Sequence, residues 1–194
     1  MNLPTELRTT RLWMRRWRAE DREPFAWLNA DPQVMEYFPA LLSREESDER
    51  VERIEAHFQQ HGFGLWAVEL SEMESFVGFI GLSILRPDMP CAPGVEIGWR
   101  LAAEHWGQGY ATEGARAVLE FGFGPLQLEQ IVSFTVPANL RSRRVMEKIG
   151  MKHSPNEDFD HPLLPKGHPL HRHVLYRAMR PSQNACRSLP TPRL

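Results

Sequence analysis

The stretch Glu96–Thr112, EIGWRLAAEHWGQGYAT, contains the change from strand to helix around which the rest of the chain can be arranged. Its first residues are typical of a strand, Gly107 and Gly109 follow, and a helix is expected to begin at about Tyr110. Glycines let backbone N–H groups turn inward against an anion, and a helix N-terminus adds roughly half a positive charge. The stretch therefore predicts either a cradle for a phosphate group or only a tight turn.

This loop does not match two common nucleotide-binding motifs. No Gly-Lys-Ser/Thr sequence follows it, as a Walker loop requires. A dinucleotide fingerprint needs a third glycine and a downstream acid for the ribose, and neither is found here. The choice between cradle and turn therefore depends on the rest of the chain.

Periodicity predicts an order of strands and helices on both sides of the loop. Strands are expected at 11–17, 65–70, 75–85, 95–101, 130–136 and 173–179, and helices at about 19–28, from 31, at 43–60, 110–123 and 139–149. Consecutive strands imply antiparallel hairpins, whereas strand–helix–strand implies a parallel crossover. The fold class is therefore α+β, or a three-layer α/β arrangement, with a mixed sheet flanked by helices.

Two local features refine this reading. Gly78 and Gly81 interrupt the long middle strand and indicate a bulge or a close backbone neighbour. The charged run Arg44–Arg53 is expected to be a solvated helix face.

Length and composition exclude several classes of protein. The 194 residues suit one domain, expected at 1–180, followed by a loose tail at 181–194. A net charge of −2 gives no field for nucleic acid. Cys91 and Cys186 form no disulfide framework, and no signal peptide or membrane span is evident. We therefore expect a soluble, cytoplasmic protein that binds neither nucleic acid nor membranes.

A second element lies at residues 139–151, NLRSRRVMEKIGM, where Asn139 caps a short helix and Gly150 ends it. Ser142 lies three and seven positions before Val145 and Ile149, so its hydroxyl shares their apolar face. A serine there either bonds its own backbone four residues back or faces a ligand between helix and sheet.

Together, HWGQGYATEGARAVLEFGF and VPANLRSRRVMEKIGMKH resemble the Gcn5-related N-acetyltransferases (GNAT), specifically the branch of ribosomal-protein alanine acetyltransferases (RimJ/RimL-like). The resemblance covers about Leu7 to Met179. It implies a mostly antiparallel central sheet, splayed strands that bind acetyl-CoA, and transfer of the acetyl group to an amine. Two positions depart from the wider superfamily: Trp106 replaces Arg or Gln at the start of the loop, and Met146 stands where many relatives place a catalytic tyrosine.

The resemblance also implies a set of cofactor-binding residues. They are Trp99, Arg100, Leu101, Trp106, Gly107, Gln108, Gly109, Tyr110, Ala111, Thr112, Asn139, Ser142 and Arg144. Backbone N–H groups of the loop would hold the pyrophosphate, and the strand ending at Leu101 would pair with the pantetheine amides if it splays from strand 130–136. A backbone N–H near Trp99–Leu101 would lie near the developing oxyanion. Ser142 would protonate the departing thiolate, whose usual pKa is near 8.5.

Glu96 is the candidate general base that removes the proton of the acceptor ammonium, directly or through a water. The alternative is an ion pair on the strand face with Arg100, four residues on. Phe25, Trp27, Tyr37 and Phe38 are candidates to border the acceptor pocket, since the first helices cover that side in the family.

His161, His168, His171 and His173 form a cluster with Asp158 and Asp160. Such spacing could ligate zinc, line the substrate site or serve packing, and the prolines within the segment favour an extended loop over a ligand cage. We expect no metal.

The sequence thus predicts an N-acetyltransferase that uses acetyl-CoA and an amine acceptor, either a protein N-terminus or a small molecule, by direct attack in a ternary complex. The alternatives are a catalytically silent acyl-CoA-binding module and a zinc hydrolase. A homodimer stays open.

Overall fold

A nine-stranded sheet runs through the part of the chain that the computed structural model describes, residues 3–72 and 75–181. The strands are β1 (Leu7–Arg8), β2 (Leu12–Arg15), β3 (Leu65–Leu70), β4 (Ser75–Ile84), β5 (Val95–Leu101), β6 (Gln130–Thr135), β7 (Lys152–His153), β8 (Phe159–Asp160) and β9 (Arg172–Met179). The α-helices are α1 (Arg22–Ala30), α2 (Arg44–His61), α3 (Tyr110–Phe123) and α4 (Leu140–Lys148), and short 3-10 turns occur at Ala19–Asp21, Ala103–His105 and Pro155–Glu157.

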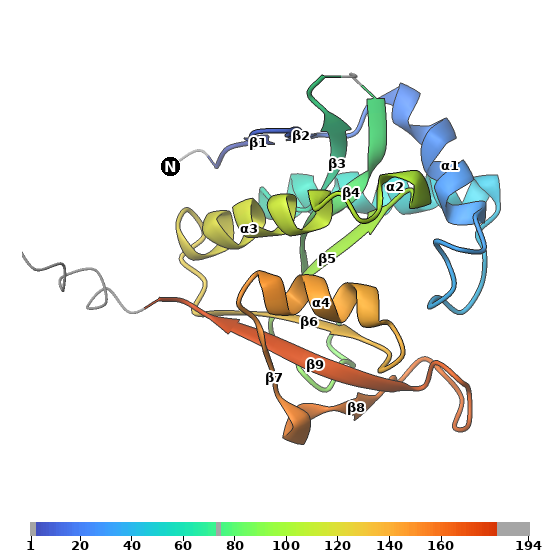
Figure 1. The fold of residues 1–194 in the computed structure, drawn as a ribbon, viewed down its shortest axis with the longest axis vertical. Helices are drawn as coiled ribbons and strands as arrows, with labels where there is room; N and C mark the ends of the chain where they lie inside the picture. The colour runs from blue at the N-terminus through green and yellow to red at the C-terminus, as the bar shows by residue number, and fades with distance from the viewer. Residues whose placement is uncertain (1–2, 73–74, 182–194) are drawn as a thin grey trace, which may run out of the picture.

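The strands follow the order β1-β2-β3-β4-β5-β6-β9-β7, and β8 pairs with β9. Every pairing is antiparallel except that of β5 with β6. In that parallel pairing only Glu96 and Val132 are in register, so β5 and β6 diverge beyond this point (Figure 1). The predicted mixed, mostly antiparallel sheet with splayed strands is confirmed.

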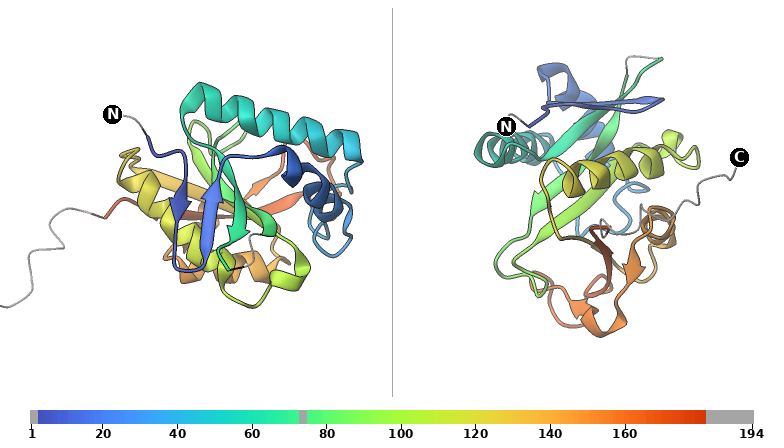
Figure 2. Two further views of the ribbon diagram at one scale, coloured as in Figure 1. Left: turned by 90° about the horizontal axis from the view of Figure 1, so that it is seen from above. Right: turned by 90° about the vertical axis from the view of Figure 1, so that its left-hand side faces the viewer.

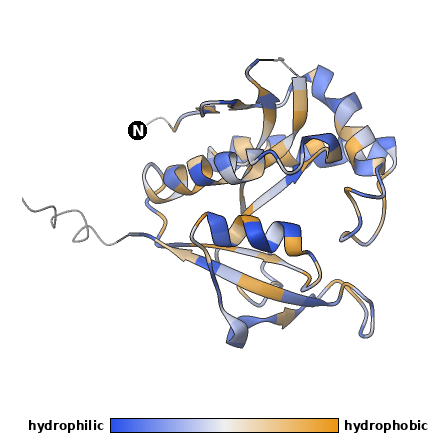
Figure 3. Cartoon of the chain, viewed as in Figure 1, coloured by the Kyte–Doolittle hydropathy of each residue, from blue (hydrophilic) through white to orange (hydrophobic). Residues whose placement is uncertain are grey.

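Helices cover both faces of the sheet (Figures 1 and 2). Alternation along the strands assigns the faces: Phe79 points toward Phe25 of α1, with ring centroids 6.0 Å apart, whereas Ile80 contacts α3 at Gly114. Apolar residues recur along β4 and β9 (Figure 3), and the main core lies between the sheet and the helices. The arrangement therefore has three layers.

Capping explains where α2 begins and ends. The Ser43 hydroxyl accepts a hydrogen bond from the Glu46 N–H at 3.2 Å, while the Glu46 carboxylate accepts one from the Ser43 N–H at 2.7 Å. Gly62 ends the helix with a φ of 74°, in the left-handed region. These caps explain why the helix expected at 43–60 begins and ends where it does.

The suspected irregularity in the middle strand is also confirmed. The register between β3 and β4 shifts at Val68/Glu69, opposite Gly78. Gly78 has a φ of 141°, and a Cβ there would collide with the Arg100 carbonyl oxygen of the neighbouring strand. Only glycine fits this close approach.

Some expectations differ from the structure. The helical piece expected from Asp31 is wrong: residues 32–37 form turns and residues 38–40 a bend, with single hydrogen bonds such as that from the Met35 N–H to the Asp31 carbonyl at 3.0 Å. The two-residue strands β1, β7 and β8 were not predicted, because so short a run carries no period. The expected loose tail, apart from Pro181, lies outside the described residues. None of the described helices combines the length and apolar character needed to cross a membrane.

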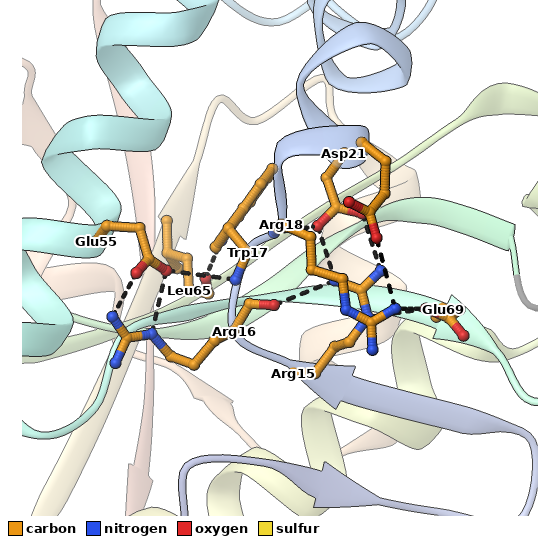
Figure 4. A network of polar contacts seen from close by, with 9 residues as sticks. Arg15, Arg16, Trp17, Arg18, Asp21, Glu55, Leu65 and Glu69 are labelled. Atoms are coloured by element: carbon orange, nitrogen blue, oxygen red, sulfur yellow. Dashed lines mark hydrogen bonds and ion pairs between the residues drawn. The ribbon is translucent and has the colours of Figure 1, made fainter.

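A buried ionic network joins β2 to β3 and to the turn before α1 (Figure 4). The Arg15 guanidinium forms two hydrogen bonds with Asp21, at 2.7 and 2.9 Å, and one with Glu69 at 2.8 Å. Burial opposes the charge of Arg15, but the hydrogen bonds to Asp21 and Glu69 outweigh it and raise its pKa. All three side chains are at most 5% exposed. The network therefore holds β2, β3 and the turn before α1 together.

Candidate active site

A cavity of about 700 Å³ opens where β5 and β6 diverge. Its walls are the loop before α3, the first turns of α3 and α4, the segment after α1 and the segment between β8 and β9. The glycine loop and the starts of α3 and α4 form one part of this lining. Another part comprises Tyr37, Phe38, Arg50, Phe79 and Arg100, and Glu96 belongs to the same lining.

The glycine loop forms the first end. Gly107 and Gly109 have φ values of 76° and 84°, and Gly109 directly precedes α3, so the first N–H groups of that helix are exposed without a side-chain cap. The turn before it is closed by hydrogen bonds from His105 N–H to Ala102 and from Trp106 N–H to Ala103, at 3.0 and 3.1 Å. Such a helix N-terminus favours a phosphate group.

Trp106 links this loop to β5. Its indole N–H donates to the Leu101 carbonyl at 2.8 Å, and the Arg141 guanidinium lies over its ring at 4.3 Å. The indole therefore fixes the loop against the free edge of β5, at the position where Arg or Gln was expected from the wider superfamily.

Arg11 supports the loop from β2's side and was missed in the sequence. Its guanidinium donates to the Gln108 carbonyl at 3.0 Å and to the Glu113 carboxylate at 2.6 Å. The Thr9 hydroxyl and the Arg11 N–H also donate to Glu113, and these bonds together outweigh burial and lower the Glu113 pKa. No local pattern in the sequence could have joined residues so far apart.

Asn139 and Ser142 form the wall opposite the loop. The Asn139 amide oxygen accepts from the Ser142 N–H at 3.1 Å, which is the predicted cap, and its NH₂ donates to Thr135 at 3.0 Å. The Ser142 hydroxyl lines the cavity and makes no hydrogen bond to the described residues. Of the two readings of this serine, the structure favours the one in which it faces the space between helix and sheet.

Glu96 lies on β5 at the last paired position before the strands diverge, opposite Ser83 of β4 and Val132 of β6. Its carboxylate makes no hydrogen bond or ion pair with the described residues, and the half-buried side chain lines the cavity. Burial raises its pKa to about 7, against the opposing attraction of Arg50. A carboxyl group with this pKa can accept a proton near neutral pH.

The alternative ion pair between Glu96 and Arg100 is not formed. Arg100 is 4% exposed and donates through Nη1 to the Asn29 amide oxygen, and its guanidinium lies 3.9 Å from the Phe38 ring centroid. Asn29, which is fully buried, is held in turn by a 2.9 Å bond from its NH₂ to the Ser47 hydroxyl. The Arg100 side chain therefore points toward α1, away from the glycine loop.

The expectation that Arg44–Arg53 is a solvated face is wrong for Arg50. This residue lines the cavity and lies four positions before the buried Ile54 and three after the buried Ser47. An arginine on the apolar stripe of a helix was the signal that could have indicated it.

The aromatic residues proposed for the acceptor side divide into two groups. Tyr37 and Phe38 line the cavity, whereas Phe25 is fully buried in the core and Trp27 is 67% exposed. The chain after α1, although not helical, thus still covers the pocket.

Two of the four histidines also line the cavity. His161 and His173 have ring centroids 5.0 Å apart, and burial lowers the pKa of both. His168 and His171 are not part of the lining. Within residues 3–72 and 75–181, no three His, Cys, Asp or Glu side chains gather in a way that could hold a metal ion.

The structure brings together all but one of the site residues predicted from the sequence. The cavity lining includes Glu96, Trp99, Arg100, Leu101, Trp106, Gly107, Gly109, Tyr110, Ala111, Thr112, Asn139, Ser142 and Arg144. Gln108 is the exception, since it is exposed and its amide NH₂ donates to the Glu104 carbonyl at 3.1 Å.

Comparisons with known proteins agree with this geometry. Residues 11–152 match the family model described as acetyltransferase (GNAT) domain, so the chain belongs to the GNAT acetyltransferases, a family that uses acetyl-CoA. An uncharacterized protein, YkkB, from Bacillus subtilis (strain 168) is 36% identical over 79% of this chain and 89% of its own. FsC-acetyl coenzyme A-N(2)-transacetylase from Aspergillus fumigatus is 31% identical over 76% of this chain and 65% of its own.

A solved structure shows the same fold. The acetyltransferase (GNAT family) from Bacillus anthracis superposes with a TM-score of 0.76 at 27% identity, over 90% of this chain and 98% of that one. The fold and the family are therefore shown. The chemical class of the acceptor has to be inferred from the geometry of the site.

Proposed function

We propose that this protein is a single-domain, cytoplasmic N-acetyltransferase, with its domain at residues 1–180, that transfers the acetyl group of acetyl-CoA to a primary amine. The observation that carries the proposal is one cavity, opening where β5 and β6 diverge, whose lining contains both a helix N-terminus with free N–H groups and an unpaired carboxyl group of raised pKa. Acetyl-CoA supplies the acetyl thioester.

The residues at the glycine loop fit the donor. Gly107, Gly109 and the first turn of α3 offer backbone N–H groups to a pyrophosphate, and the exposed Arg144 adds a positive charge at the cavity wall. The free edge of β5 from Trp99 to Leu101 offers backbone groups to the amides of an extended arm. Asn139 and Ser142 border this path from the other side.

Glu96 would remove the proton of the acceptor ammonium. With a pKa of about 7 it is partly ionised at neutral pH, and it lines the same cavity as the glycine loop and the acceptor residues. Ser142, which lies on the α4 side of the cavity, would return a proton to the thiolate that leaves. No cysteine lines the described cavity, which supports direct attack by the amine in a ternary complex.

The acceptor class is either a protein N-terminus or a small amine. The motifs of α3 and α4 support the ribosomal-protein alanine acetyltransferase branch, whereas the Aspergillus relative is named for transfer to an N(2) position. Both alternatives require the same donor site and the same base.

Thiol release from acetyl-CoA, measured with a panel of amino acids, polyamines and N-terminal peptides, tests the proposal. We expect amine-dependent release by the wild-type protein and a loss of about 100-fold or more in Glu96→Gln, the typical contribution of a general base. Calorimetry with acetyl-CoA separates the steps: binding without turnover across the whole panel would contradict catalysis and favour a silent acyl-CoA-binding module.

A further inference from the structure

Two arginines from different elements line the part of the cavity formed by Tyr37, Phe38, Arg50, Phe79 and Arg100, which we call the acceptor end. Arg50 comes from α2 and Arg100 from β5, and both line the cavity. Their guanidinium carbons lie 5.9 and 5.5 Å from the centroid of the same ring, that of Phe79 on β4. The Arg100 guanidinium also lies 3.9 Å from the ring centroid of Phe38. Both positive charges thus adjoin the Phe79 ring, and Arg50 is near enough to Arg100 to oppose its charge.

Neither guanidinium has a carboxylate partner among the described residues. Arg50 makes no hydrogen bond or ion pair there, and Arg100 makes only its bond to the neutral Asn29. The Nε atoms of both are buried without a hydrogen-bond partner. A buried guanidinium without an anion is costly, and the neighbouring Arg50 adds repulsion for Arg100.

The other ionisable groups of this end do not balance the charge. Glu96 has a pKa of about 7 and is only partly ionised at neutral pH. Burial lowers the pKa of His161 and His173, which favours their neutral imidazoles. Glu36 and Asp48 are engaged by other arginines, Arg141 at 2.8 Å and Arg44 at 2.8 Å. The acceptor end therefore carries excess positive charge in a partly apolar space.

We propose that the acceptor amine carries an oxyanion, in the first place a carboxylate, that pairs with Arg50 and Arg100 while the amine faces Glu96. This inference rests on the proposed acetyltransferase function and names the class of its acceptor. A guanidinium presents a planar fork of donors that matches a carboxylate, and Arg50 has all of its donors available. The rings of Tyr37, Phe38 and Phe79 suit an apolar body between the two charged ends, as in an aromatic or aliphatic amino acid.

The same arrangement selects against polycations. A polyamine would place a second ammonium near two guanidiniums that lack counter-charges, and like-charge contacts in a desolvated pocket reduce binding strongly. An amine of the same size without a negative group would leave both guanidiniums without an anionic partner. They would then add nothing to the affinity for that amine.

Matched acceptors test this directly through kcat/KM. The first set compares amino acids with their amides, beginning with phenylalanine and phenylalaninamide. The second compares phosphoethanolamine with ethanolamine. Spermidine serves as the polycation. We expect the anionic member to be preferred at least about tenfold, and the two sets of pairs distinguish carboxylate from phosphate. Arg50→Gln should lower kcat/KM for the preferred anionic acceptor about tenfold or more, and so reduce the preference for that acceptor over its neutral counterpart. Arg53→Gln is the control, since Arg53 lies one turn along α2, is 67% exposed and pairs with Glu49.

Product binding gives a readout that does not depend on turnover. Calorimetry should show N-acetylphenylalanine binding to the CoA complex at least about tenfold more tightly than N-acetylphenylalaninamide, with the difference lost in Arg50→Gln. A preference for neutral or polycationic acceptors, or equal binding of the two products, overturns the inference while leaving the acetyltransferase function intact. Failure to bind acetyl-CoA at all would instead contradict the proposed function.

Discussion

The guanidinium of Arg11 and the carboxylate of Glu113 are joined at 2.6 Å across 102 positions of sequence, and the same guanidinium holds the Gln108 carbonyl at 3.0 Å. Arg11 comes from the turn between β1 and β2, whereas Glu113 lies in the first turn of α3. The glycine loop, which we propose to bind the pyrophosphate, is therefore held in place by the first hairpin of the chain. Without Arg11, the Glu113 carboxylate would lie uncompensated at the helix end that is proposed to bind pyrophosphate.

Arg11→Gln should therefore weaken acetyl-CoA binding. Loss of an exposed ion pair costs about 1 kcal/mol, which corresponds to a rise of roughly three- to tenfold in the KM for acetyl-CoA, with kcat little changed. Steady-state kinetics at fixed acceptor measures both parameters. Arg44→Gln removes a comparable exposed pair on α2, the one with Asp48, and should leave the KM unchanged; an equal rise there would assign the effect to general charge.

Glu96 should determine the pH dependence of the reaction. Because its pKa is raised to about 7, kcat/KM for the amine should increase with pH and level off above about pH 7 to 8, as far as the acceptor's own pKa allows. Glu96→Gln should lower kcat/KM and remove this limb. A profile that keeps the limb in Glu96→Gln would show that another group, such as His161 or His173, is the base. Glu49→Gln, an exposed carboxylate on α2, is the matched control.

The same carboxyl group should make stability depend on pH. Its pKa is about 7 in the folded protein and about 4.3 in the unfolded chain, so the unfolded state releases the proton first as pH rises. The contribution of Glu96 to folding therefore falls between about pH 4.5 and pH 7 and stays low above it. Urea unfolding should find the stability of Glu96→Gln relative to wild type rising over this range by up to roughly 3 kcal/mol. A difference that does not change with pH would contradict the raised pKa.

Local sequence signals predicted the long elements because each carries its own period and boundary residues. Ser43 and Glu46 fix the start of α2, and Gly109 and Gly124 bound α3, all within a few residues of sequence. The segment 32–37 was misread as helical, since an Asp-Pro pair is equally typical of a turn. The part of the cavity formed by the glycine loop and the start of α4 was predicted for the same reason, because each of these motifs is continuous in the sequence.

The acceptor half could not be predicted in this way. Arg50, Arg100 and Asn29 come from three elements, and their proximity depends on how α1 and α2 pack on the sheet. The backbone of Arg100 was proposed to face the cofactor, and the sequence did not indicate that its side chain bonds Asn29 of α1. Only the folded structure shows which layer of helices the side chain of an arginine on β5 contacts.

Ser142→Ala tests the proposed proton donor. The hydroxyl lines the cavity and bonds no described residue, so its loss should leave the melting temperature nearly unchanged. General acid catalysis contributes about 10²- to 10⁴-fold, and since a thiolate leaves readily we expect a fall in kcat near 100-fold. Ser142→Thr keeps a hydroxyl and should restore a large part of kcat. If Ser142→Ala changes only the KM for acetyl-CoA, the serine binds the donor and does not supply the proton.

The network around Arg15 predicts the largest effect on stability. Arg15→Met would leave the Asp21 and Glu69 carboxylates buried without their shared cation, and breaking such a buried network costs about 3–5 kcal/mol. Denaturant unfolding measures this loss, and Arg16→Met is the comparison, because its pair with Glu55 is partly exposed and should contribute about 1 kcal/mol or less. Adding Asp21→Asn and Glu69→Gln to Arg15→Met removes the uncompensated charges, so most of the stability should return. If the triple variant stays as unstable as Arg15→Met, the arginine stabilises this edge of the sheet through packing and not through its charge.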